Sequence, residues 1–257
     1  MSFFNYKGAN VYYEELGSGE PLLFVHDWNS SSKSFLKLNA RFLTKSFRVI
    51  ALDLPGYGKS DALEGLKFGD LSLIIESLLG HMGIKQSHLI GFCMGSAVIL
   101  DFYLKFPRLT GNLFLIEPLL RFPKVLRPLL LPYFGTWFLK NLGIMHRLLR
   151  VLGAGLFLQN TAANSRIFKS LDRNEAKISK SYLQLLYEEH LVGSFHKLSS
   201  ANLENTSCIT GSKSHLLFRN NLCWIKENLK LKRFIELEDA GHFLLIEQPG
   251  KVAEIIN

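Results

Sequence analysis

The chain has 257 residues, a net charge of +8, 47% hydrophobic residues and 20% charged residues. These proportions exclude a disordered chain, a collagen-like repeat and a miniature domain that depends on disulfides. The length allows one large domain or one domain with a sizeable insertion.

The three cysteines, Cys93, Cys208 and Cys223, are scattered and form no CxxC pair. This pattern indicates neither a zinc knuckle nor a disulfide framework and favours a reducing compartment. Residues 1–17 lack a basic start, a long apolar run and a cleavage site, so we expect no export signal and a cytoplasmic location.

Short apolar runs bounded by glycine, proline and polar residues predict buried strands. In the first half of the chain we expect strands at 11–16, 21–26, 46–53, 87–92 and 109–117. Apolar residues at helical spacing predict a helix near 67–83 and another over 93–106, which Pro107 ends. Strands that alternate with helices predict an α/β fold with a mainly parallel central sheet and helices on both faces.

The next strand candidate, 206–211, lies nearly ninety residues further along the chain. A loop of that length without structure is improbable in a compact domain. We therefore expect a core made of residues 1–117 and 203–257, and an inserted, mostly helical cap over 118–202. After the cap the sequence predicts a helix at 216–229, a strand at 232–238 and a final helix that begins at Pro249.

Gly91-Phe92-Cys93-Met94-Gly95 lies where a predicted strand runs directly into a predicted helix. Glycines two residues before and after Cys93 would relieve crowding in a very sharp turn, and the central side chain would project from it. A helix N-terminus and a nearby histidine are expected to lower the pKa of such a thiol. The alternative is a buried cysteine of the core.

Four motifs occur in order: VHDW at 25–28, DLPGYGKSD at 53–61, GFCMGS at 91–96 and AGHFLLIEQP at 240–249. With these motifs the chain resembles the α/β-hydrolase superfamily, in particular its small cap-bearing esterases and thioesterases. The resemblance implies nucleophilic catalysis by Cys93, where serine is usual, with His242 as the general base.

The carboxylate partner of the histidine departs from the commonest pattern of this family. Ser214 stands where an aspartate is usual, whereas Glu117 ends a core strand at the position that some relatives use instead. We therefore expect a triad of Cys93, His242 and Glu117. The alternative for Glu117 is a strand-end carboxylate that pairs with an arginine of the cap.

The resemblance places the oxyanion hole at the backbone N–H groups of Trp28 and Met94. Asp27 replaces the usual glycine, so we expect its side chain to strain the turn and its charge to oppose an oxyanion unless it is protonated or points away. Asp27, Phe92 and Phe243 are expected to contact the substrate. We interpret His26, Asp53 and Asp61 as structural residues.

Residues 118–171 contain no acid but eight cations. These are Arg121, Lys124, Arg127, Lys140, Arg147, Arg150, Arg166 and Lys169. Over 137–152 cations and apolar residues form separate helical stripes, which is typical of an amphipathic helix. The stretch could be a solvated face, attract coenzyme A or an acyl carrier protein, or contact a membrane surface. No motif indicates nucleic-acid binding, and no apolar run is long enough for a transmembrane segment.

These features predict an acyl-transfer hydrolase, a carboxylesterase or thioesterase, that acts on a small-molecule acyl substrate. An acyltransferase that works through an acyl-cysteine is one alternative, and a non-catalytic binding protein on a hydrolase scaffold is another. The triad chemistry needs no metal and no organic cofactor.

Overall fold

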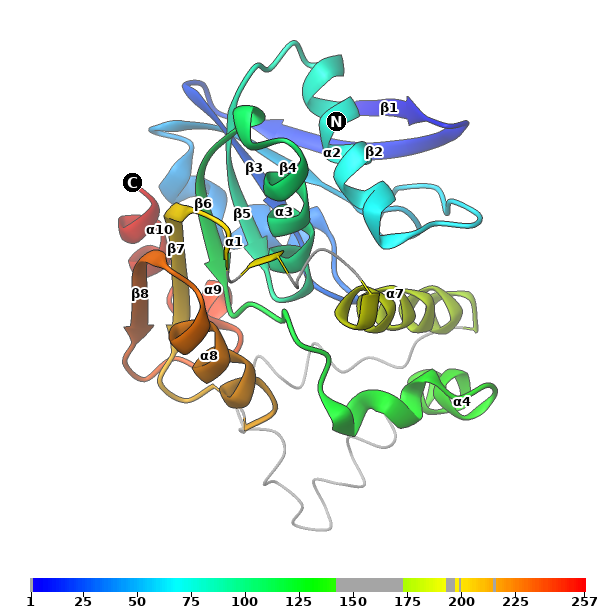
Figure 1. The fold of residues 1–257 in the computed structure, drawn as a ribbon. Coiled ribbons are helices and arrows are strands. Elements are labelled where there is room, and N and C mark those ends of the chain that lie inside the picture. The colour runs from blue at the N-terminus through cyan, green and yellow to red at the C-terminus, as the bar shows by residue number, and fades with distance from the viewer. Residues whose placement is uncertain (1, 142–172, 193–196, 199, 215) are drawn as a thin grey trace.

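The computed structural model describes residues 2–141, 173–192, 197–198, 200–214 and 216–257. Their central feature is one eight-stranded sheet with the strand order β1-β2-β4-β3-β5-β6-β7-β8, in which only β1 and β2 run antiparallel to their neighbours (Figure 1). The strands are β1 (Ser2–Tyr6), β2 (Ala9–Leu16), β3 (Glu20–Val25), β4 (Phe47–Leu52), β5 (Ser87–Phe92), β6 (Thr110–Ile116), β7 (Leu203–Gly211) and β8 (Leu231–Leu237).

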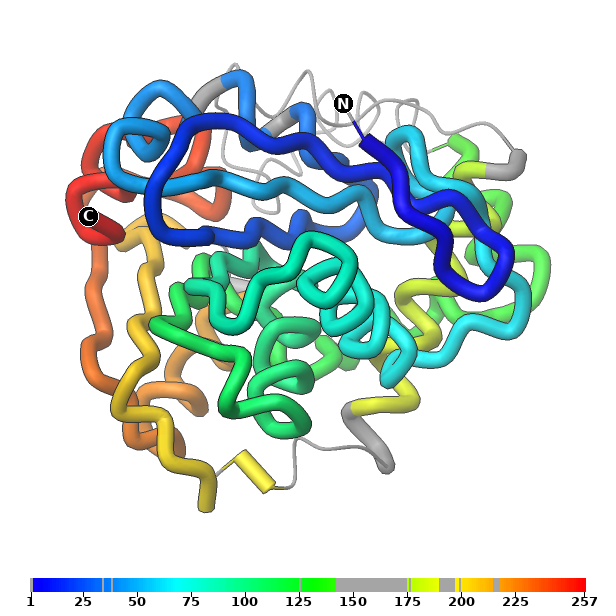
Figure 2. The backbone as a smooth tube through the Cα atoms, turned by 90° about the horizontal axis from the view of Figure 1, so that it is seen from above, coloured from blue at the N-terminus to red at the C-terminus, as the bar shows by residue number. Residues whose placement is uncertain are grey.

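Helices cover both faces of this sheet (Figure 2). The helices of the core are α1 (Ser32–Leu43), α2 (Phe68–His81), α3 (Met94–Lys105), η1 (Pro107–Leu109), α8 (Leu216–Asn228), α9 (Leu244–Glu247) and α10 (Pro249–Ile256). On one face α2 packs against α3, and on the other α1 packs against α10. The predicted α/β fold with a mainly parallel sheet is therefore confirmed.

Every strand and helix that we predicted for the core is present, with ends within a few residues of the prediction. The strand β1 and the helices α1, α9 and η1 were not predicted. In α1 the apolar residues Phe35, Leu36, Ala40 and Leu43 are all buried at helical spacing, but the equally buried Asn39 interrupts their stripe. The Asn39 side chain donates hydrogen bonds to two backbone carbonyls, which makes burial of its amide tolerable.

Between β6 and β7 the chain leaves the sheet at its carboxyl edge and forms η2 (Lys124–Leu130), α4 (Phe134–Lys140) and α7 (Arg173–Val192) (Figure 1). The boundaries of this insertion, 118–202, stay a prediction. Of the amphipathic helix expected over 137–152, residues 137–140 belong to α4, and residues 142–152 lie outside the described part of the chain. No helix among the described residues is both long enough and apolar enough to cross a membrane.

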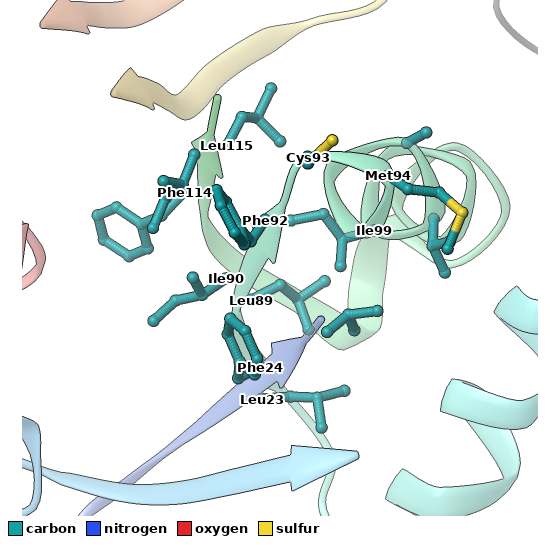
Figure 3. Packing of buried hydrophobic residues seen from close by; sticks show 14 of the residues in the cluster. Leu23, Phe24, Leu89, Ile90, Phe92, Cys93, Met94, Ile99, Phe114 and Leu115 are labelled. Carbon is teal, nitrogen blue, oxygen red and sulfur yellow. The ribbon is translucent and has the colours of Figure 1, made fainter. Parts of the chain in front are cut away.

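Beneath the sharp turn at Cys93 the core is mainly apolar. Side chains of β3, β5, β6 and α3 interlock there, with Phe92 and Cys93 at the point where β5 meets α3 (Figure 3). Most side chains on both faces of these central strands are inaccessible to solvent, as expected for parallel strands covered by helices. This packing fixes the ends of β5 and β6, which carry Cys93 and Glu117.

Buried polar residues hold the loops at the same edge. His26 bridges two loops, because its Nδ1 contacts the Asp27 carbonyl oxygen at 2.7 Å and its Nε2 accepts the Leu54 N–H at 3.0 Å. Asp53 accepts the N–H groups of Ser32, at the start of α1, and Lys59. These contacts agree with the structural roles expected for His26 and Asp53.

Replacement of Asp53 by alanine should lower the free energy of unfolding by about 2–4 kcal/mol, because two backbone N–H groups lose their buried acceptor. Urea unfolding of the purified protein measures this change. Asp61→Ala is the matched control: the Asp61 carboxylate accepts from the backbone and side chain of the exposed Asn10, so its loss should cost about 1 kcal/mol or less. Equal losses from the two variants would contradict the role given to Asp53.

Candidate active site

The turn between β5 and α3 holds Cys93 in a strained conformation. Its φ of 50° and ψ of −109° lie outside the regions open to most side chains, at a cost of about 1–3 kcal/mol. A Cβ on Gly91 would lie 2.6 Å from the Gly95 backbone, and one on Gly95 would lie 2.2 Å from the carbonyl oxygen of Val25. Only glycine fits at either position, so the predicted reason for both glycines is confirmed.

The Cys93 thiol is buried and unionised at neutral pH. Burial is the largest cause that raises its pKa well above the ordinary value, and the negative charges of Asp27 and Glu117 act in the same direction. The Met94 backbone N–H, at the start of α3, opposes them and does not outweigh them. The expectation that the helix end and a histidine give a low pKa is therefore wrong. A base must remove the proton during attack.

His242 lies in the loop after β8 with its side chain nearly buried. Its ring stacks on Phe218 of α8 with centroids 4.0 Å apart, and Phe92 and Phe243 lie 5.3 Å and 5.1 Å away. Three aromatic rings thus fix the imidazole beside Phe92, the residue that precedes Cys93. Its Nδ1 lies 3.1 Å from Oε2 of Glu117. A neutral ring that donates from Nδ1 keeps Nε2 free to accept a proton.

Glu117 follows the last residue of β6, is fully buried, and has a φ of 47°. While Oε2 faces His242, Oε1 accepts hydrogen bonds from the Thr210 hydroxyl at 2.6 Å, the Gly211 N–H at 2.7 Å and the Ser214 hydroxyl. Burial alone would raise the pKa of Glu117, yet these donors, with His242 foremost, hold that pKa below its ordinary value. The carboxylate is ionised, and within the described part of the chain its charged partner is His242 rather than an arginine. Arg147, Arg150 and Arg166 of the insertion lie outside the described residues.

Ser214 stands at the position where the family usually has an aspartate. Here it stabilises Glu117, the acid that takes the place of that aspartate. Its side chain is buried and donates to Glu117. Sequence analysis identified Ser214 but missed this role, and it missed Thr210, Gly211 and Phe218 altogether. The signal available in the sequence was the pair of hydroxyl residues Thr210 and Ser214, one before and three after Gly211, at the end of the strand that neighbours β6.

Trp28 joins the loop after β3 to the insertion. Its indole Nε1 donates to the Ser179 carbonyl oxygen of α7 at 2.8 Å, and its ring packs against the buried Leu139 of α4. The Met94 backbone N–H, at the start of α3, donates to the sulfur of Cys93. The contacts of Trp28 involve its side chain rather than its backbone N–H, so the oxyanion hole at Trp28 and Met94 stays a prediction.

Asp27 is partly exposed and acts electrostatically on both Cys93 and His242. Burial of its carboxyl raises the pKa of Asp27 to about 6, and the charge of His242 and the hydroxyl of Ser30 oppose that rise. The expectation that Asp27 itself strains the turn is wrong, because the left-handed residue of this loop is Asn29, with a φ of 59°. Asp27 is thus a carboxylate of the site that changes charge near neutral pH.

A separate groove of about 450 Å³ lies between the loop after β4 and α7, and its wall includes Pro55, Leu66, Ile178 and Tyr182. None of the triad candidates lines it, so it is not the place of the chemistry. In the described part of the chain no three histidine, cysteine or acidic side chains gather as a metal site would require.

Glu117→Gln should slow the acylation of Cys93 by a p-nitrophenyl ester about 10²- to 10⁴-fold, because a neutral amide cannot stabilise the imidazolium that forms on His242. Mass spectrometry of the Cys93 peptide follows the rate. Asp239→Asn, which removes an exposed carboxylate that pairs with Lys213, should leave the rate unchanged. A wild-type rate in Glu117→Gln would remove Glu117 from the triad.

Asp27→Asn should lower the pKa of the Cys93 thiol, because one of the negative charges that raises this pKa is lost. Alkylation of Cys93 by iodoacetamide above pH 7 should become several-fold faster. Below pH 6 the two proteins should converge, since the Asp27 carboxyl, with its pKa of about 6, is then protonated in the wild type. The exposed Cys223 of the same molecule is the internal control. A slower reaction of Cys93 would contradict the electrostatic account.

Residues 20–249 match the family model described as the alpha/beta hydrolase fold. One curated relative is an uncharacterized hydrolase, YugF, of Bacillus subtilis, which is 31% identical over 58% of this chain and 58% of its own length. Another is 2-hydroxy-6-oxo-6-phenylhexa-2,4-dienoate hydrolase of Comamonas testosteroni, which is 28% identical over 42% of this chain and 40% of its own length. The chain therefore spans about half the length of these relatives. An alpha/beta hydrolase enzyme from a deep-sea metagenome library superposes with a TM-score of 0.80 over 99% of this chain and 95% of its own, at 16% identity. The chain belongs to the alpha/beta hydrolase fold family.

Proposed function

We propose that the protein is an acyl-transfer hydrolase, a carboxylesterase or thioesterase, that works through an acyl-cysteine at Cys93. The observation that supports this most is the contact between Nδ1 of His242 and the buried, ionised Glu117, beside the strained turn of Cys93. This arrangement leaves Nε2 as a base for a thiol that is unionised at rest. A cysteine of the core would need none of these groups.

In the first half of the reaction His242 removes the thiol proton as sulfur attacks the carbonyl carbon of an ester or thioester. The N–H groups of Trp28 and Met94 would stabilise the negative charge that develops on the carbonyl oxygen, a contribution of about 3 kcal/mol per donor in comparable sites. When the tetrahedral intermediate collapses, the bond to the leaving alcohol or thiol breaks, and His242 returns the proton to it.

In the second half the acyl-cysteine is hydrolysed. His242 removes a proton from water as the water attacks the thioester carbonyl, and sulfur leaves and regains a proton. The products are a free carboxylic acid and the original thiol. Throughout the cycle Glu117 keeps its charge and stabilises each imidazolium, while the hydroxyls of Thr210 and Ser214 hold the carboxylate in place.

The acyl part of the substrate is apolar in this proposal, because Phe92 and Phe243 flank the catalytic imidazole. Asp27, whose pKa of about 6 leaves it mostly ionised at neutral pH, disfavours an anionic group close to the thiol. Its own position suits a substrate group that donates a hydrogen bond or carries a positive charge. The names of the relatives agree with this proposal at the level of hydrolysis.

Incubation of the wild type with p-nitrophenyl esters and acyl thioesters should give an acyl adduct on Cys93, detectable by intact mass, followed by release of free acid. Cys93→Ala should give no adduct on that peptide, and Cys208→Ala is the matched control, since Cys208 is equally buried but lies inside β7. A folded wild type that forms neither adduct nor acid would favour a binding protein on this scaffold.

The same reaction with amine and alcohol acceptors distinguishes hydrolysis from transfer. Release of free acid at the same rate with and without acceptor is the expected result, because water resolves the intermediate. Conversion of the acyl group into amide or new ester in preference to acid would identify an acyltransferase instead.

A further inference from the structure

The insertion carries an apolar ridge on its surface. Seven large hydrophobic side chains are exposed among the described residues, and four of them fall within seven consecutive positions. These four, which we call the ridge, are Leu131 (56% exposed), Tyr133 (90%), Phe134 (43%) and Trp137 (55%). The other three, Phe3, Leu16 and Leu73, lie in β1, β2 and α2, apart from one another in the sequence. A concentrated apolar surface of this kind is typical of an interaction site.

The backbone presents these side chains to solvent. Tyr133 has a φ of 61°, a left-handed conformation that is costly for a residue with a large side chain. Its side chain recovers no energy by burial within the described structure. Gly135 must approach the Leu129 carbonyl oxygen, because a Cβ there would lie 1.8 Å from that atom. This tight packing orients the start of α4 so that Phe134 and Trp137 face outward, 6.3 Å apart between centroids.

In the segment that carries the ridge, residues 118–141, every charged side chain is positive. Arg121, Lys124, Arg127 and Lys140 are all exposed. The neighbouring helix α7 contributes both signs, with Lys177 and Lys180 against Glu175, Glu188 and Glu189. Residues 118–171 contain no acid, so the segment that carries the ridge contributes only positive charge, and the acids nearby come from α7.

We propose that the ridge docks on the surface of an anionic lipid membrane. Cations alone would suit an acidic carrier protein, but four exposed apolar side chains also require an apolar medium, and tryptophan and tyrosine favour the boundary between lipid headgroups and acyl chains. The insertion leaves the sheet at the edge that carries Cys93 and Glu117 (Figure 1), so docking brings that edge toward the bilayer. Docking does not depend on the proposed catalysis.

Sedimentation of the full chain with vesicles tests the proposal. We expect binding to vesicles of phosphatidylcholine with phosphatidylglycerol and much weaker binding to phosphatidylcholine alone. The double variant Lys124→Gln with Lys140→Gln should bind anionic vesicles about thirty-fold more weakly, at about 1 kcal/mol for each cation. The matched control is Lys37→Gln with Lys85→Gln, which removes two exposed lysines far from the ridge and should bind as the wild type does.

The apolar arm of the experiment uses Tyr133→Ser with Trp137→Ser, which should abolish vesicle binding. Leu16→Ser with Leu73→Ser is its control, since both leucines are 38% exposed elsewhere on the molecule, and should change nothing. Quenchers carried on lipid should reduce tryptophan fluorescence of the wild type, and Trp137→Ser should remove this quenching. Circular dichroism shows whether each variant is folded.

Three results would overturn the proposal. They are a wild type that binds neither vesicle, vesicle binding that survives the loss of Tyr133 and Trp137, and binding to a soluble acidic acyl carrier protein, but not to vesicles, that depends on Lys124 and Lys140. Cys93→Ala should bind vesicles as the wild type does. Docking without catalysis and catalysis without docking are therefore distinguishable.

Discussion

The contact between His242 and Glu117 is the constraint on which the rest of the site depends. It joins the end of β6 to the loop after β8, and the donors on Oε1 add the end of β7 and the loop that follows it. A buried carboxylate is stable only where such donors replace water. The three strand ends therefore surround one charge, and that charge fixes the imidazole that we propose as the base for Cys93.

The residues that follow the neighbouring strands β5 and β6, Cys93 and Glu117, share the same backbone geometry and the same kind of hydrogen bond. Cys93 and Glu117 both have left-handed backbones, and their N–H groups donate to Ile116 and Ile209 of the adjacent strands at 2.8 Å and 2.9 Å. The ladder thus continues into both strained residues. The apolar packing of β5 and β6 beneath them offsets the strain and keeps each side chain at the carboxyl edge.

Sequence reasoning reached the fold because covered parallel strands have long apolar runs. It named Cys93 and His242 from ordered motifs and Glu117 from the end of a predicted strand, and of these three residues the structure joins His242 and Glu117. It failed where the outcome depends on neighbours far away in the chain. The thiol pKa is set by burial and by Asp27, sixty-six residues earlier, rather than by the helix end alone. Helix α1 was missed because the burial of Asn39 depends on a carbonyl of Leu245.

The hydrogen bond from Ser214 to Glu117 also bears on how such sites can change over evolution. An aspartate at 214 would place a second acid against Oε1 of a carboxylate that is already buried. Two negative charges at that separation cannot both persist, so one would take up a proton and the imidazole would lose its clear partner. Positions 117 and 214 are therefore mutually exclusive sites for an ionised carboxylate, and moving the acid from one to the other requires a change at both.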